Sequence, residues 1–215
     1  MITHHLPESE APAVRRLLAT TSMLLSYPDQ GAVDRLNLVG RSLDELPHGS
    51  REPLRRMTEW LSSTDLVNAQ AHYVEIFDRR RKACLYLTWF LNGDTRSRGM
   101  ALVGFKERYQ EAGFDLGPEE LPDFLPVVLE FGAVGPVDAA LEMLARHRAG
   151  LELLEHALAK FDSPYVDPVS ALLAVVPAAP DGPTAEELAF AGPPAEQVGL
   201  APFFPVESLK AGVHA

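Results

Sequence analysis

The chain contains little that could build a metal centre, a disulfide or a membrane span. Its 215 residues include a single cysteine, Cys84, so neither an intramolecular disulfide nor a multi-cysteine zinc or iron–sulfur site can form. The longest stretch without a charged residue, Pro168–Pro180, has 13 residues, whereas a transmembrane helix needs about 20. The first residues lack the basic and apolar regions of a secretory signal. We therefore expect a cytoplasmic protein without a membrane span.

Positive charge and catalytic motifs are also scarce. The chain has 19 basic against 30 acidic residues, a net charge of −11, and phosphate backbones repel such a chain, so we expect no nucleic-acid partner. The dinucleotide fingerprint, the P-loop, the HEXXH zinc motif and the GXSXG nucleophile elbow are all absent. None of the seven histidines stands three or four residues from another. The sequence thus predicts no metal site, no cofactor and no enzyme, with Cys84 as an inert buried thiol.

What the chain does contain favours helices. Alanine and leucine total 58 residues, whereas the β-branched valine and isoleucine total 19. Hydrophobic residues make up 47% of the chain, enough for a core. We therefore predict an all-α, single-domain helical bundle. Apolar residues at helical spacing place its helices at 14–25, 33–46, 50–61, 66–77, 83–91, 102–109, 122–131, 137–145, 151–161 and 169–176.

Composition divides the chain into three parts: a flexible N-terminus over 1–12, the helical domain over 13–176 and a tail over 177–215. The tail holds 7 of the 18 prolines and 4 glycines, which is typical of an extended segment. Within it, the spacing of Thr184 and Glu187 predicts a capping box for one helical turn. The pair Phe203 and Phe204 predicts docking of the tail, because burying each ring stabilises by roughly 1.5–3 kcal/mol.

Three segments carry residues that could form a binding site. In the first, Tyr73 and Phe77 share a helix face and precede the charged run Asp78–Lys82. These aromatics are either a core stripe or part of a site, and the basic run either faces solvent or pairs with an acidic surface. In the second, Arg96 and Arg98 either hold an anion at a helix start or bridge to acids in a capped turn.

The third segment, Glu119–Phe131, combines acidic residues, two prolines and apolar side chains. Residues 107–130 carry seven acids and one base, whereas residues 78–108 carry eight bases and three acids. These opposite charges either neutralise each other across helices or leave an acidic rim around an apolar groove. Such a groove would suit a basic amphipathic helix from a partner.

Five stretches of the chain match a known family: LLSYPD (24–29), HYVEIFDRRR (72–81), GDTRSRGMAL (93–102), FKERYQEAGFDL (105–116) and ELPDFLPVVLEF (120–131). Together they resemble the NarJ family of molybdenum cofactor assembly chaperones of respiratory nitrate reductase. The resemblance runs from about residue 17 to residue 176 and is strongest between His72 and Phe131.

The resemblance implies an all-helical fold of the TorD/DmsD chaperone type and no catalytic activity. It implies a cytoplasmic chaperone that binds the N-terminal helix of the unfinished catalytic subunit, assists insertion of the molybdenum cofactor and is absent from the finished enzyme. Proteins that deliver the cofactor are further candidate partners. Relatives often carry histidine where this chain has Phe124. The expected client-binding residues are Tyr73, Phe77, Glu120, Pro122, Asp123, Phe124 and Glu130, with Arg96 and Arg98 as possible contacts to an anion or the client.

Two alternatives remain open from the sequence. One keeps the fold and changes the client to another molybdoenzyme, such as a dimethyl sulfoxide or selenate reductase. The other is a small enzyme that holds a phosphorylated ligand on Arg96 and Arg98 and uses His72 or Asp94 as a base. If the acidic rim binds the client, Asp123→Lys should weaken binding and leave the melting point nearly unchanged.

Overall fold

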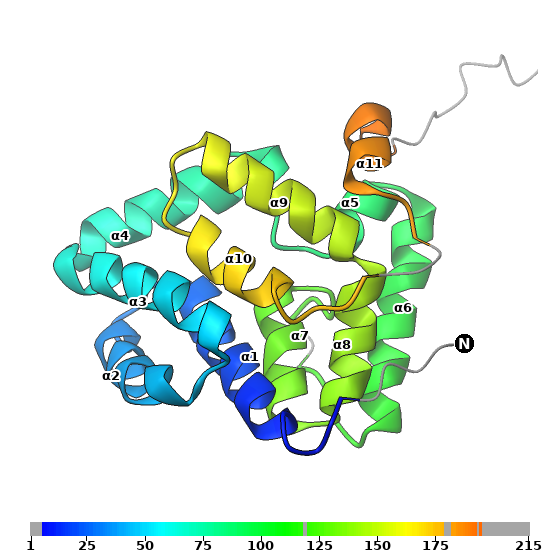
Figure 1. Ribbon diagram of the computed structural model, residues 1–215. Helices are drawn as coiled ribbons and strands as arrows, with labels where there is room; N and C mark the ends of the chain where they lie inside the picture. The colour runs from blue at the N-terminus through cyan, green and yellow to red at the C-terminus, as the bar shows by residue number, and fades with distance from the viewer. Residues whose placement is uncertain (1–5, 118–119, 179–181, 193, 195–215) are drawn as a thin grey trace, which may run out of the picture.

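The chain folds into helices that pack around two central ones (Figure 1). The computed structural model describes residues 6–117, 120–178, 182–192 and 194. Within these residues there is no β-strand, only an isolated antiparallel bridge between Tyr86 and Phe124. The α-helices are α1 (Ala11–Leu25), α2 (Ala32–Ser42), α3 (His48–Ser63), α4 (Leu66–Tyr73), α5 (Thr88–Asn92), α6 (Arg96–Glu111), α7 (Leu125–Val134), α8 (Val137–Arg146), α9 (Arg148–Lys160), α10 (Val166–Leu173) and α11 (Ala185–Ala191).

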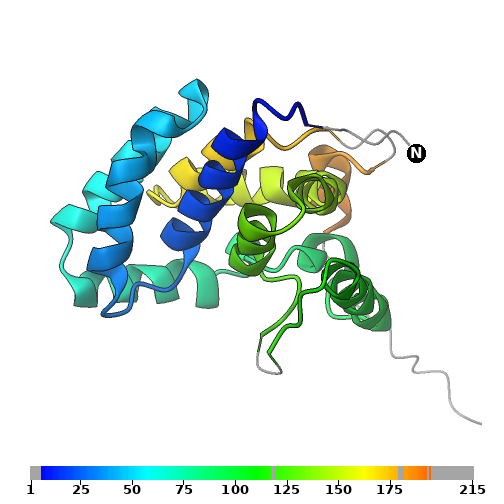
Figure 2. The same ribbon diagram turned by 90° about the horizontal axis from the view of Figure 1, so that it is seen from below.

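Helices α1 and α7 form the centre of the bundle and lie side by side in both views (Figures 1 and 2). One face of α1 is apolar, and its Leu17 and Leu18 are fully buried. Gly132 on α7 allows the close approach, because a Cβ there would lie 2.6 Å from Leu18 Cδ1 and 2.7 Å from Ala140 Cβ of α8. A larger residue at this position would push the three helices apart.

The other helices surround this centre. Helix α10 packs against α1, α3 and α9, while α5 packs against α6 and α11 against α9. Helices α2 and α3 lie to one side of α1, and α6 lies at the opposite side of the molecule (Figure 2). The all-α prediction is confirmed, and most helices lie where the apolar spacing places them.

Two local predictions differ from the structure. The third helix, predicted from Ser50, already begins at His48, and the buried Ser50 hydroxyl donates a 3.3 Å hydrogen bond to the Ala171 carbonyl. Residues 83–91 do not form one helix, since α5 begins only at Thr88. The residues before it are extended because the Leu85 carbonyl accepts from the Leu125 amide (2.8 Å). Such a long-range bond leaves no signal in local apolar spacing.

Leu6 and helix α11, near the two limits of the described residues, both take part in the fold. The Leu6 amide donates to Asp138 (3.2 Å) and α1 begins at Ala11, so part of the segment expected as a flexible N-terminus belongs to the bundle. The capping box between Thr184 and Glu187 is confirmed, although it starts the seven-residue helix α11 rather than a single turn. The predicted docking of Phe203 and Phe204 lies outside the described residues.

His147 joins α8 to α9 and is packed against Phe105. Its Nδ1 donates to the Met143 carbonyl (2.8 Å), and its ring lies 5.3 Å from that of Phe105, centroid to centroid. Burial lowers the pKa of His147 below its usual value of 6.5. Burial also lowers the pKa of His72.

These two histidines predict a stability that falls in mild acid. Below about pH 6.5 the unfolded chain binds protons on both histidines before the folded chain does, so the free energy of unfolding should decrease as the pH falls from 7 towards 5. Urea unfolding at several pH values measures this slope. His147→Gln should flatten the slope, whereas the same change at the exposed His48 of α3 should leave it as steep. An equal slope in wild type and His147→Gln would contradict the assignment.

Candidate functional site

A groove opens where the C-terminal end of α1 meets the start of α7. Its volume is about 380 Å³. Aromatic and aliphatic side chains form its walls, and two carboxylates, Glu120 and Glu130, stand exposed at its edge. We call it the acidic groove; it is lined by Ser22, Ser26, Tyr86, Glu120, Leu121, Phe124, Pro126, Val127 and Glu130.

A hydrogen bond holds one wall of the groove in place, and part of the groove's apolar surface is exposed to solvent. The Ser22 hydroxyl of α1 donates to the Pro126 carbonyl (2.9 Å), which ties α1 to the first turn of α7. The Tyr86 and Phe124 rings lie 5.4 Å apart beside their backbone bridge. Leu121 keeps 41% of its surface exposed, so this wall presents apolar area to solvent.

Asp123 lies beneath the groove and not on its rim. Its side chain is 0% exposed and accepts hydrogen bonds from the backbone amide (3.3 Å) and hydroxyl of Thr88. The Arg98 guanidinium lies 3.8 Å from the carboxylate and donates to the Thr88 hydroxyl (3.2 Å). The expectation that Asp123→Lys would spare stability is therefore wrong, because the carboxylate anchors the segment before α7 to α5.

Pro122 is also buried beneath the groove, next to Asp123 in the chain. Its carbonyl accepts a 2.6 Å hydrogen bond from the Tyr109 hydroxyl of α6. Of the expected client-binding residues in this segment, the structure exposes Glu120 and Glu130, half-buries Phe124, and buries Pro122 and Asp123. The exposed and half-buried residues line the acidic groove, and the buried pair positions them.

The two arginines of the second segment have different surroundings. Arg98 contacts Thr88 and Asp123 and lies 5.6 Å from the Tyr86 ring centre, so it takes part in the support of the groove. Arg96 is exposed in the first turn of α6. His72, proposed as a base beside them, instead bonds to the Ser163 hydroxyl (3.0 Å) and stacks on Tyr165. The structure therefore does not assemble the enzyme constellation of Arg96, Arg98 and His72.

Tyr73 and Phe77 belong to a separate aromatic cluster. Tyr73 is buried and its hydroxyl donates to the Leu25 carbonyl (3.2 Å), whereas Phe77 is half-buried. Both rings pack against the buried Tyr165. Tyr27, 44% exposed, packs edge-on against Tyr73. Because Tyr27 directly follows Ser26 of the acidic groove, this cluster supports the end of the groove formed by α1.

Two of the arginines after Phe77 pair with Glu75, which lies just before it. A turn of π-helix spans Val74–Asp78, and Glu75 pairs with Arg79 (3.4 Å) and Arg80 (2.6 Å). The Arg80 guanidinium also lies over the Phe161 ring. This part of the basic run thus pairs within its own segment, and not with the acidic groove.

Burial shifts the pKa of two side chains that interact with Asp123 and Arg98. Burial raises the pKa of the Cys84 thiol above its usual value, so Cys84 is protonated near neutral pH. Burial also raises the pKa of Tyr86, and the carboxylates of Asp123 and Asp78 act in the same direction. Neither group is prepared for nucleophilic chemistry.

Neither a metal centre nor a membrane span is found in the described part of the chain. Among the residues with described positions, no three His, Cys, Asp or Glu side chains gather in a way that could hold a metal ion. None of the helices described is both long and apolar enough to cross a bilayer.

Three groove residues lie outside the three segments that the sequence singled out as possible binding sites: Ser22, Ser26 and Tyr86. Ser26 and the neighbouring Tyr27 lie in the stretch LLSYPD, one of the five matched to the NarJ family, so a signal was present for them. Tyr86 gave none, because its role depends on the extended pairing with Phe124.

Known proteins match most of this chain. A family model described as nitrate reductase delta subunit matches residues 43–171. The probable nitrate reductase molybdenum cofactor assembly chaperone NarJ of Bacillus subtilis is 32% identical over 158 residues, which cover 72% of this chain and 85% of that protein. NarJ of Escherichia coli K12 is 35% identical over 69% of this chain and 64% of its own length. The nitrate reductase-like protein NarX of Mycobacterium tuberculosis is 37% identical, but the match covers only 21% of it.

A solved structure shares the fold. The putative redox enzyme maturation protein of Archaeoglobus fulgidus superposes with a TM-score of 0.55 at 21% identity, over 74% of this chain and 91% of that one. At this identity the likeness shows the helical architecture alone. The family model and the relatives at 32–35% identity show the family: the chain belongs to the nitrate reductase delta subunit family and is a relative of the NarJ-type assembly chaperones.

Proposed function

We propose that this protein is a cytoplasmic assembly chaperone that binds the N-terminal segment of the apo catalytic subunit of nitrate reductase. It assists insertion of the molybdenum cofactor and leaves before the enzyme is complete. The family match and the names of the relatives support the nitrate reductase client over another molybdoenzyme. The observation that carries the proposal is the acidic groove, with its exposed apolar wall and its two carboxylates.

The groove has the properties that binding of an amphipathic helix requires. A helix presents apolar side chains at positions i, i+3, i+4 and i+7, and the wall of Leu121, Phe124 and Val127 offers them apolar area. Glu120 and Glu130 attract basic residues on the flanks of that helix. Micromolar binding corresponds to about −8 kcal/mol, which a few buried anchors supply after the costs of ordering. Such an affinity also permits release.

Isothermal titration calorimetry tests the proposal directly. The full chain is titrated with a peptide of the first ~25 residues of the nitrate reductase catalytic subunit from the same organism. We expect binding in the micromolar range. The corresponding peptide of a dimethyl sulfoxide reductase tests the alternative client: tighter binding of that peptide would reassign the client, and no binding of either peptide would refute the proposal.

Glu130→Lys should weaken this binding by about 1–3 kcal/mol, roughly 5- to 150-fold, because it places a like charge opposite a basic helix. Glu130 is exposed, so the melting temperature should change little. Glu59→Lys makes the same charge change on an exposed position of α3 outside the acidic groove and serves as the control. Equal affinities for the two variants would show that Glu130 does not face the client.

A further inference from the structure

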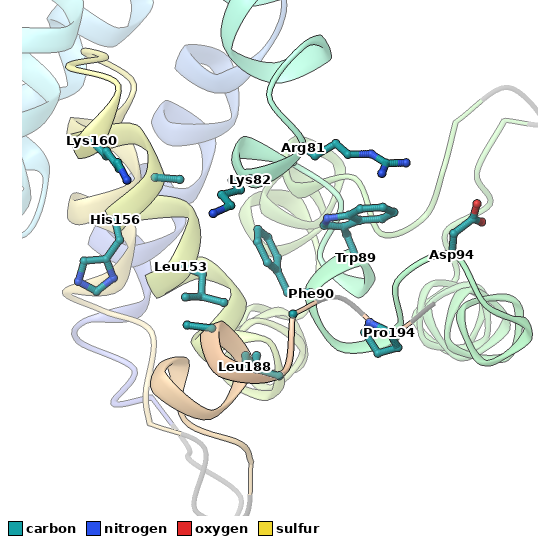
Figure 3. A pocket seen from close by; sticks show the side chains of 13 residues that line it. Arg81, Lys82, Trp89, Phe90, Asp94, Leu153, His156, Lys160, Leu188 and Pro194 are labelled. Carbon is teal, nitrogen blue, oxygen red and sulfur yellow. The ribbon is translucent and has the colours of Figure 1, made fainter. Parts of the chain in front are cut away.

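A second, larger cavity lies between α5, α9 and α11, away from the acidic groove. Its volume is about 920 Å³. Phe90 and Leu153 form apolar walls from α5 and α9, and Leu188 of α11 closes a third side (Figure 3). Trp89 stands at the side of the same space. The size falls within the roughly 300–1,000 Å³ typical of sites for small organic ligands.

Positive charge gathers around this cavity although the chain as a whole carries −11. The charged residues that line it are Arg81, Lys82 and Lys160 against a single acid, Asp94, and His156 stands beside them. Within the described residues, Lys82 and Lys160 have no ion-pair partner. The neighbouring acids of α9 have other partners: Glu152 pairs with Arg148, and Glu155 accepts from Ser170.

The cavity also holds an aromatic surface beside these charges. The Arg81 guanidinium lies 5.9 Å from the Trp89 ring centre, so a cation is held against one ring at the mouth. Phe90 is buried deeper in the wall. A planar ring can pack against such aromatic side chains, while an anionic substituent is attracted by the lysines.

The wall made by the C-terminal part of the chain depends on one glycine. Gly93 has a positive φ of 55°, and a Cβ on it would lie 1.8 Å from the Pro194 carbonyl oxygen. Only glycine therefore lets the backbone after α11 approach the end of α5. Gly192 and Pro194 lie at the edge of the cavity as a result.

We propose that this cavity, the basic cavity, binds a small ligand that combines a planar aromatic ring with a phosphate, sulfonate or carboxylate group. The lysines Lys82 and Lys160 recognise the anionic group, and the ring packs against Trp89 and the apolar walls. The site lies outside the acidic groove, so it can be filled while a client occupies that groove. The test of ligand binding uses no client peptide. A negative result would therefore leave the proposed chaperone function unaffected.

Two fluorescent probes with nearly the same rings and different charge test the proposal on the full chain. These are 8-anilinonaphthalene-1-sulfonate, an anion, and N-phenyl-1-naphthylamine, which is neutral. We expect the anion to bind at least tenfold tighter than the neutral probe. In the double variant Lys82→Glu, Lys160→Glu this preference should disappear. The affinity for the anion should fall at least tenfold, whereas the affinity for the neutral probe should stay within twofold of the wild-type value.

Matched variants keep the result interpretable. Lys106→Glu reverses a charge on an exposed position of α6 outside the basic cavity, and it should leave both affinities unchanged. If the double reversal unfolds the protein, Lys82→Gln with Lys160→Gln should lower the anion's affinity in the same direction. Equal affinity for the two probes in wild type would overturn the proposal. A competition experiment could also overturn it. If a peptide of alternating Glu and Leu displaces the anionic probe and binds tighter than the probe does, the cavity serves a protein partner and not a small ligand.

Discussion

Replacing Tyr165 by alanine is expected to lower the free energy of unfolding by about 3–5 kcal/mol. Tyr165 is 0% exposed and lies at the centre of the aromatic cluster. Its ring centre is 4.9 Å from that of Phe77 and 5.7 Å from that of Tyr73, and Trp60 packs at 5.9 Å. Truncation would leave a cavity between α3, α4 and the start of α10. Urea denaturation at pH 7.5 measures the loss.

Tyr165→Phe is the matched control for this prediction. The buried Tyr165 hydroxyl has no hydrogen-bond partner among the described residues, and burial raises the pKa of this tyrosine far above its usual range, so the hydroxyl is neutral. Removing it keeps the packing and relieves an unsatisfied polar group, so stability should be unchanged or should rise by roughly 1 kcal/mol. Comparable losses in the alanine and phenylalanine variants would mean that the hydroxyl, not the ring, stabilises the cluster.

Asp123→Ala should cost about 3 kcal/mol of folding stability. The change removes the acceptor for the Thr88 amide and hydroxyl and leaves the Arg98 guanidinium without its carboxylate. The segment before α7 would lose its anchor, so peptide binding in the acidic groove should also weaken in the variant that remains folded. Urea denaturation gives the first effect, and calorimetry below the unfolding transition gives the second.

Two further variants distinguish the loss of the hydrogen-bond acceptor at Asp123 from the loss of a negative charge. Asp123→Asn keeps an acceptor for Thr88 and should lose less stability than the alanine variant. Glu130→Ala removes an exposed carboxylate of the same groove and should stay within about 0.5 kcal/mol of wild type. A wild-type stability in Asp123→Ala would show that the network of Thr88, Asp123 and Arg98 does not hold this segment.

The sequence predicted the helices well where an apolar face repeats over several turns, as in α1, α8 and α9. It failed over residues 83–91, because the extended pairing of Leu85 and Leu87 with residues 123–125 depends on a segment distant in the chain. It also grouped Asp123 with Glu120 and Glu130, from their shared charge and from the family resemblance. Composition does not reveal that Asp123 is buried beneath the groove while the other two carboxylates reach solvent.

By itself the sequence determined the all-α class and the segments that contribute to the candidate site, because helical periodicity and motif composition are local properties. Only the tertiary structure decided which of those residues lie at the surface of the acidic groove. Burial and hydrogen bonding made Asp123, Pro122, Arg98 and Tyr73 supports, and left Glu120, Phe124 and Glu130 at the acidic groove. The basic cavity likewise appeared only on folding, since Leu188 of α11 and the following Gly192 and Pro194 lie beside α5 and α9. Sequence spacing carries no information about such distant contacts.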